Sequence, residues 1–397
     1  MDRTDVFVSG AGIAGLVAAA AFAARGFTVA VADPAPPVRD ADADGSDLRS
    51  TAYLRPATDL FRDAGLWDAL APAATPLRAL RVAESRGDPP ALVADRLFNA
   101  SDLGPEPFGW NVPNWLARKT LADRLAGDDR VDLRLGTGVR DVLPRDREAV
   151  VTLAGGARIA ARLVVAADGR GSPVREGAGI PVRTTRYGQS ALAFVAAHDL
   201  PHDDVSTEIY RSGGAFTLVP LADRDGRAHS AVVWMEDAAE AARLSALDAV
   251  AFDAALQARS CGVLGTIGRV SPVRTWPVVT QEARRLTARR TALVAEAAHV
   301  LPPIGAQGLN TSLADVAALV RIAAEAPGDL GGAAMLDRYE RARAADVHAR
   351  ATVIDAFNRL CRSGDPLRSA LRATGLALVH DLAPLRLSLM RAGLGGA

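Results

Sequence analysis

The sequence predicts a mixed α/β fold in two unlike parts, followed by C-terminal helices. The first 33 residues have the pattern of a strand, a glycine-rich turn, a helix and a second strand, which is one βαβ unit. From Tyr187 to about Val279 the pattern changes to short alternating strands, which indicates a mostly antiparallel sheet. After this sheet, the pattern of the first part resumes with an apolar strand and long helices. The first domain is therefore discontinuous in sequence, and the antiparallel sheet is inserted into it.

The expected elements follow from apolar periodicity and from the turn residues that separate them. In the first part we expect strands at 5–9, 28–33, 131–135, 149–153 and 162–167, helices at 13–25, 49–66 and 116–125, and an acidic loop at 40–47. In the rest we expect strands at 191–196, 206–210, 216–219, 230–234 and 291–294, and helices at 238–258, 309–326 and 335–360.

A chain of 397 residues is long enough for two or three lobes. We expect residues 1–80, 100–180 and 285–365 to form the first domain. Residues 81–99 and 181–284 would form the inserted sheet domain, and 366–397 a C-terminal helical segment.

Composition excludes several classes of function. The 46 basic and 46 acidic residues cancel, so no overall field favours nucleic acid as a partner. The two cysteines, Cys261 and Cys361, have no metal-ligand spacing, and we expect neither a disulfide nor a metal site. The first residues are too acidic for a secretory signal, and glycines interrupt the apolar stretch 6–24. These features predict a cytoplasmic protein.

The turn Gly10-Ala11-Gly12-Ile13-Ala14-Gly15 is the first functional motif. Gly10 permits a tight turn, Gly12 lets the backbone approach a pyrophosphate, and Gly15 lets helix and strand pack closely. The second strand ends at Asp33, the distance at which a carboxylate receives ribose hydroxyls. The motif therefore predicts a Rossmann-like dinucleotide site. An acidic residue there favours an unphosphorylated ribose, as in FAD or NAD.

Two later motifs favour FAD. The strand 163–167 delivers an Asp168-Gly169 turn with basic residues close behind. The strand 291–295 ends in Glu296, a proline pair follows, and the glycine-rich turn 305–308 opens a helix. A carboxylate in that place can accept ribityl hydroxyls, and free amides at the start of a helix can stabilise negative charge on a flavin.

In this order and spacing, the three motifs resemble those of FAD-dependent hydroxylases related to para-hydroxybenzoate hydroxylase. Within that group the chain is most similar to the ubiquinone-biosynthesis hydroxylases, at 187–191, 213–221, 232–234 and 274–277. The resemblance assigns cofactor contacts to Gly10, Gly12, Ala14, Gly15, Asp33, Arg49, Arg118, Asp168, Glu296, Gly305, Gln307, Gly308, Leu309 and Asn310.

The chain departs from the family pattern at three places. Ala295-Glu296 stands where the family has Gly-Asp, and Gly305-Ala306-Gln307-Gly308 where it has Gly-Gly-Gln-Gly. Glu296 keeps the acceptor chemistry, so FAD binding is expected, with lower affinity. Trp115 stands where many relatives have Arg, which weakens the assignment of Arg118.

The resemblance implies an FAD-dependent monooxygenase that uses NADH or NADPH and O2 to hydroxylate an aromatic ring. The expected substrate is a polyprenylated phenol in ubiquinone biosynthesis. The alternatives are a soluble aromatic substrate and a non-catalytic flavoprotein scaffold in a quinone-synthesis assembly. A single dinucleotide fingerprint predicts that NAD(P)H docks transiently. No catalytic side chain is assigned, since His299 beside a tight turn is more often structural.

The tail 366–397 alternates leucines with arginines. It could lie on the inner face of a membrane, which would make the protein peripheral. It could equally form helices that close the apolar base of the protein.

Overall fold

The apolar N-terminal strands assemble into an eight-stranded sheet, which is parallel at its centre. The structure, a computed structural model, describes residues 1–362 and 380–394. The strand order is β18-β19-β11-β1-β2-β8, and a β9–β10 hairpin pairs antiparallel with β11. The strands are β1 (Asp2–Ser9), β2 (Val29–Asp33), β8 (Val131–Leu135), β9 (Val139–Pro144), β10 (Ala149–Leu153), β11 (Arg158–Ala166), β18 (Thr287–Ala288) and β19 (Thr291–Leu293). Neighbouring β1, β2 and β11 place their carboxyl ends at one edge, where the motif turns follow.

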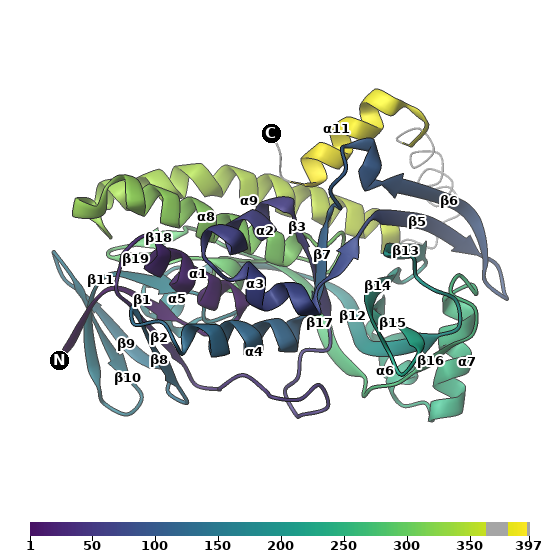
Figure 1. Ribbon diagram of the computed structural model, residues 1–397, viewed down its shortest axis with the longest axis horizontal. Coiled ribbons are helices and arrows are strands. Elements are labelled where there is room, and N and C mark those ends of the chain that lie inside the picture. Colours follow the sequence, from purple (N-terminus) through teal and green to yellow (C-terminus); the bar gives the residue numbers. More distant parts are fainter. Residues whose placement is uncertain (363–379, 395–397) are drawn as a thin grey trace.

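Helices cover this sheet and fix its turns in place. The apolar helix α1 (Ile13–Ala24) is buried over most of its length and packs against both α4 (Asn114–Leu125) and α8 (Gln307–Glu325). Figure 1 shows these helices beside the parallel strands. The short α5 (Pro173–Gly177) follows β11 and starts with a Ser172 cap. The predicted βαβ unit is confirmed.

A nine-stranded sheet forms the second part of the molecule. Its order is β20-β17-β12-β15-β14-β13-β5-β6, with β16 beside β12, and only the β13–β5 pair is parallel. The strands are β5 (Ala79–Arg86), β6 (Ala91–Asn99), β12 (Val182–His198), β13 (Val205–Arg211), β14 (Gly214–Arg224), β15 (Arg227–Asp237), β16 (Ile267–Arg269), β17 (Arg274–Ala283) and β20 (His299–Val300). The strands expected at 191–196, 206–210, 216–219 and 230–234 all lie within it. The helices α6 (Ala238–Ser245) and α7 (Ala249–Arg259) pack on one face, where Phe252 meets Phe194 and Trp234.

The helix expected over 49–66 is wrong in its first third. Ser50–Leu54 is the strand β3, which pairs with β7 (Gly109–Pro113), and β4 (Thr75–Leu77) completes a three-stranded sheet. Helix α2 (Arg55–Asp63) begins only after it, and α3 (Trp67–Leu70) follows. Pairing with a distant strand overrides the local helical spacing. The helix expected over 238–258 is interrupted between α6 and α7, where Asp248 caps the second helix.

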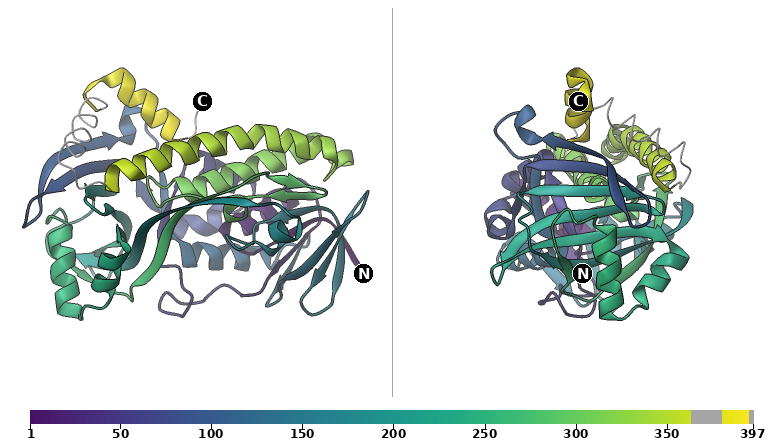
Figure 2. Two further views of the ribbon diagram at one scale, coloured as in Figure 1. Left: turned by 180° about the vertical axis from the view of Figure 1, so that it is seen from behind. Right: turned by 90° about the vertical axis from the view of Figure 1, so that its right-hand side faces the viewer.

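Two C-terminal helices complete the described chain. Helix α9 (Ala333–Arg362) contacts α8 and β18 at one end and β13, β14 and β17 at the other, so it spans both large sheets (Figure 2). Helix α11 (Ala383–Gly393) lies near the C-terminal end of β6 (Figure 1), where Arg386 pairs with Asp102. The segments 363–379 and 395–397 of the expected C-terminal region lie outside the described residues. None of the described helices combines the length and apolar character needed to cross a bilayer.

Candidate functional site

A cavity of about 1440 Å³ runs from the first glycine turn to the inner face of the nine-stranded sheet. It brings together twelve of the fourteen residues assigned from the sequence, namely Gly10, Gly12, Ala14, Asp33, Arg49, Arg118, Asp168, Glu296, Gly305, Gln307, Gly308 and Leu309. Gly15 and Asn310 are not in its lining. Motifs that are almost 300 residues apart in sequence therefore share one site.

Two glycines of the first turn are required by the backbone and its packing, and the third, Gly12, has free space around it. Gly10 has a φ of +102°, and a Cβ added to Gly15 would lie 2.0 Å from the carbonyl oxygen of Gly10. A side chain at either residue would break the turn. Gly12 has no atom within 4 Å of an added Cβ, and it caps α1 without a side-chain hydrogen bond. The free amides at the start of α1 thus face open space in the cavity.

Asp33 closes this turn at the end of β2. Its Oδ2 accepts a hydrogen bond from the Ala11 amide at 2.7 Å, and its Oδ1 accepts one from the Ala35 amide at 2.8 Å. Arg118 donates to the carbonyl oxygens of the same two residues and lies 3.3 Å from Asp33 Oδ1. Oδ2 has one partner and keeps a second lone pair, so Asp33 can still receive a hydroxyl.

Arg49 is held by a partner that the sequence reasoning missed. Its guanidinium donates two hydrogen bonds to Asp47, at 2.8 and 2.7 Å, and stacks over the Trp276 ring at 4.9 Å. Asn114 donates to the same carboxylate at 2.9 Å. Burial raises the pKa of Asp47, but the charge of Arg49 and the hydrogen bonds outweigh burial and leave this pKa below its ordinary value. A bidentate pair of this kind gives Arg49 a fixed orientation in the cavity wall.

Asp168 carries a buried oxygen that lacks a partner. Its Oδ2 accepts hydrogen bonds from the Ser9 hydroxyl at 3.0 Å and the Val174 amide at 3.3 Å. Its Oδ1 is buried without a hydrogen bond from any described residue. Burial raises the pKa of this carboxyl group. Because an unsatisfied buried acceptor costs free energy, the arrangement fits a ligand that donates a hydrogen bond here.

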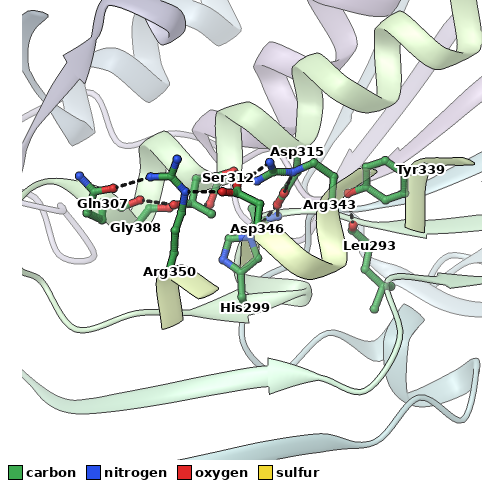
Figure 3. A network of polar contacts seen from close by, with 12 residues as sticks. Leu293, His299, Gln307, Gly308, Ser312, Asp315, Tyr339, Arg343, Asp346 and Arg350 are labelled. Carbon is green, nitrogen blue, oxygen red and sulfur yellow. Dashed lines mark hydrogen bonds and ion pairs between the residues drawn. The ribbon is translucent and has the colours of Figure 1, made fainter. Parts of the chain in front are cut away.

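A buried polar network supports the third motif (Figure 3). Asp315 on α8 is fully buried and accepts hydrogen bonds from His299 Nε2 at 2.6 Å, Arg343 Nε at 2.8 Å and the Ala295 amide at 3.2 Å. Burial raises the pKa of Asp315, but the His299 and Arg343 interactions outweigh it and lower the pKa. His299 thus anchors the turn to α8 and α9.

The network continues to the glycine-rich turn at the start of α8. Arg350 pairs with Asp346 at 3.0 Å and donates to Gln307 Oε1 at 3.0 Å, as Figure 3 shows. Gln307 Nε2 donates to the carbonyl oxygens of Gly305 and Gly393, at 3.1 and 3.4 Å. Gln307 therefore connects α9, the turn and the end of α11.

Asn310 lies outside the cavity lining, and its side chain hydrogen-bonds to the backbone. Its Oδ1 accepts a hydrogen bond from the Leu54 amide at 2.9 Å, and its Nδ2 donates to the carbonyl oxygens of Ala52 and Ala306, both at 2.7 Å. The side chain is thus engaged in joining β3 to the first turn of α8.

The second half of the cavity is mainly apolar. Its lining includes Leu80, Val82, Phe98, Val219, Val233, Phe357, Leu360, Leu389 and Met390, from the nine-stranded sheet, α9 and α11. Among these side chains lies Glu208 on β13, which sequence reasoning missed. The available signal was its spacing of two residues from Ser206 and from Tyr210, which places the three side chains on one face of β13. Such a lobe can hold an apolar ligand and orient it with a few polar groups.

Comparison with known proteins gives the family. The family model described as "FAD binding domain" matches residues 3–353. The chain belongs to this family. It is 34% identical over 395 residues to the ubiquinone hydroxylase UbiL of Rhodospirillum rubrum, covering 98% of this chain and 89% of that protein. It is 27% identical to the 3-demethoxyubiquinol 3-hydroxylase of Escherichia coli, covering 99% and 98%.

A solved structure gives the same fold. The p-nitrophenol 4-monooxygenase PnpA of Pseudomonas putida superposes with a TM-score of 0.80 at 18% identity, covering 100% of this chain and 99% of that one. The family binds FAD, and the cavity described above has the matching chemistry: free helix amides beside Gly12, a carboxylate at Asp33 and a buried acceptor at Asp168.

Proposed function

We propose that this protein is an FAD-dependent monooxygenase that hydroxylates the ring of a polyprenylated phenol in ubiquinone biosynthesis. The observation that carries the proposal is one continuous cavity, polar at the dinucleotide turn and apolar beneath the nine-stranded sheet. Similarity over nearly the whole chain to a ubiquinone hydroxylase supports the choice of substrate class.

The twelve assigned residues that line the cavity would hold FAD along its polar half. The amides beside Gly12 would receive the pyrophosphate, and Asp33 the adenosine ribose. Asp168 and Glu296 would accept hydroxyls from the ribityl chain, and Arg49 would lie against the cofactor, braced by Asp47. Gly305, Gln307, Gly308 and Leu309 would line the isoalloxazine, with Asn310 fixing the helix start behind them.

FAD, when bound and reduced by NADH or NADPH, would supply the activation of dioxygen. The protein itself would bind the flavin and the substrate, orient them relative to each other, and exclude water from the site. The apolar lobe would place the phenol ring next to the turn 305–308 and keep solvent away from it. NAD(P)H would visit transiently, because the sequence has one dinucleotide fingerprint and FAD would occupy it.

A membrane contact follows from the same substrate class. Leu382 and Leu385, both in or next to α11, are 50% and 37% exposed, and Val93 and Leu97 on β6 are 52% and 37% exposed. The two elements are adjacent, since His380 Nε2 lies 3.1 Å from the Leu97 carbonyl oxygen. This exposed apolar surface adjoins the cavity lining through Leu389. It would dock on the bilayer from which a prenylated phenol is drawn.

Flotation with phosphatidylethanolamine and phosphatidylglycerol vesicles tests this contact. The double variant Leu382→Glu and Leu385→Glu should lose most vesicle binding. Val250→Glu on α7 is the matched control, because Val250 is an 82% exposed apolar residue on another element. Equal partitioning of all three proteins would remove the membrane contact from the proposal.

The first test of function is an anaerobic absorption spectrum of the protein with FAD, before and after NADH or NADPH. We expect the flavin band to bleach, and to bleach faster when a prenylated phenol is present. Acceleration by a soluble phenol alone would favour a soluble aromatic substrate. Bound flavin that no nucleotide reduces would favour the scaffold, and failure to bind FAD would refute the proposal.

A further inference from the structure

Glu208 is a buried carboxylate at the junction of the two halves of the cavity. It lies on β13, is 6% exposed, and belongs to the cavity lining. Its Oε1 accepts a hydrogen bond from the Gly305 amide at 3.1 Å, and its Oε2 accepts one from the Tyr210 hydroxyl at 2.6 Å. Gly305 belongs to the turn next to which the proposed function places the phenol ring. Glu208 is therefore one hydrogen bond away from the proposed reaction site.

None of the residues that the structure describes forms an ion pair with Glu208, whose carboxylate is held by two hydrogen bonds. Burial raises its pKa, while the hydrogen bonds from Tyr210 and Gly305 oppose the shift only in part. Besides Tyr210, the titratable residues of the cavity lining are Glu84 on β5, Cys361 on α9, His299 on β20, Glu296 and, in the polar half, Asp33, Asp47, Arg49, Arg118 and Asp168. On β14 the cross-strand neighbour is Thr217. A carboxylate in this setting keeps free lone pairs and gains strength as a proton acceptor.

We propose that Glu208 is the catalytic base that receives the proton of the substrate's phenolic hydroxyl during hydroxylation. The inference rests on the proposed function and adds a residue to it. Phenols are attacked by an electrophilic oxygen through electron density that the hydroxyl group supplies to the ring. A base at the hydroxyl increases that density at the moment it is needed.

The phenolic O–H bond breaks and its proton moves to Glu208, while the released electron pair shifts into the ring towards the carbon that bonds the incoming oxygen. That carbon then loses its hydrogen as a proton, and the ring regains aromaticity. Dioxygen is the oxidant and NAD(P)H the reductant, and the second oxygen atom leaves as water. Glu208 gives its proton back to the product oxygen or to solvent.

The competing role for Glu208 is purely structural, as a brace for the Gly305 turn. Glu208→Gln separates the two roles because glutamine has the same shape. Its carbonyl oxygen can accept from the Gly305 amide and its NH2 group can donate to the Tyr210 oxygen, so the brace survives. The amide cannot accept a proton, so the base is lost.

The experiment measures hydroxylated product, NAD(P)H consumption and FAD affinity across pH with a prenylated phenol. In the wild type the ionised form of Glu208 is active, so kcat should rise with pH through a pKa above the usual carboxylate range. Glu208→Gln should lower product formation at least about 100-fold and abolish this rise, while FAD affinity and flavin reduction stay within about two-fold. NAD(P)H would then be consumed without product. Glu208→Asp should keep the pH dependence at a lower rate.

Glu236→Gln is the matched control. Glu236 is another carboxylate of the same sheet whose pKa burial raises, with a hydrogen bond from Trp234 at 3.0 Å, but it is absent from the cavity lining. Glu236 also lies 4.0 Å from the buried Arg259 Nε, so the variant should lose stability, but its product formation per folded protein and its pH dependence should match the wild type. Wild-type protein that forms no product would refute the proposed function itself. Product formation that is equal in wild type and Glu208→Gln, or a pH rise that persists in the variant, would refute only the role of Glu208.

Discussion

Replacing Asp315 by asparagine tests the network that anchors the third motif. Asp315 is fully buried and accepts charge-assisted hydrogen bonds from His299 and Arg343. Asparagine keeps the shape, but it loses the charge and points an NH2 group either at Arg343 or at His299 and the Ala295 amide. Breaking a buried charged network by removing one partner costs about 3–5 kcal/mol. We expect Asp315→Asn to lower the free energy of unfolding by about that much.

The expected shift in melting temperature follows from the length of the chain. An unfolding entropy of about 2.1 cal/mol/K per residue gives roughly 0.8 kcal/mol/K for a cooperative unit of this size, so a loss of 4 kcal/mol lowers Tm by about 5 °C. Differential scanning calorimetry with and without FAD measures this shift in Tm. Asp59→Asn is the control, because Asp59 pairs with Arg62 at 2.8 Å on an exposed helix face. That variant should shift Tm by less than about 1 °C.

The same variant has a signature in pH. The folded pKa of Asp315 is lowered, so its stabilisation is present above its unfolded pKa of about 3.9 and is lost as the pH falls towards the folded value. The difference in Tm between wild type and Asp315→Asn should therefore be constant near neutral pH and shrink below about pH 4. A difference under 1 °C at neutral pH would show that Asp315 does not hold the motif in the way its hydrogen bonds indicate.

Four further changes probe the cofactor site. Gly12→Ala should leave the Tm of the FAD-free protein within about 1 °C of the wild-type value but weaken FAD binding at least about ten-fold. Gly15→Ala should destabilise the FAD-free protein itself, because the added Cβ would lie 2.0 Å from a backbone oxygen. Calorimetry and fluorescence titration of FAD separate the two. Arg49→Met should weaken FAD binding about ten-fold and return the pKa of Asp47 towards the ordinary value or above it, measurable by carboxylate NMR. Ala306→Gly should bind FAD within about three-fold of wild type, and ten-fold tighter binding would mean that the Ala306 methyl hinders the flavin.

The sequence predicted the fold correctly where interactions between residues close in sequence determine the structure. The βαβ unit and its turn follow from apolar periodicity and from glycines, and the structure shows why Gly10 and Gly15 are needed there. The sequence-based prediction was wrong where pairing with a distant segment determines the secondary structure. Ser50–Leu54 is a strand because it pairs with Gly109–Pro113, about 60 residues later, and no local pattern reports that pairing.

The missed site residues have the same origin. Asp47 looked like part of an acidic loop until the fold placed the Asn114 amide and the Arg49 guanidinium around it. Glu208 looked like one polar residue in an alternating strand, because the sequence does not show that the Gly305 turn lies above it. Both are charged groups whose roles depend on contacts between separate elements, and periodicity carries no information about such contacts.

The two departures from the family's glycine pattern have a common structural feature. Ala295 and Ala306, which stand where relatives have glycine, have φ values of +57° and +55°, so both keep the left-handed backbone that glycine adopts without strain. The cost is about 1–2 kcal/mol for each alanine, and two effects offset it. Alanine has less conformational entropy to lose on folding, and each methyl group packs against an apolar cluster. The chain has therefore kept the shape of the turns while changing their residues, which favours a working cofactor site over a degenerate one.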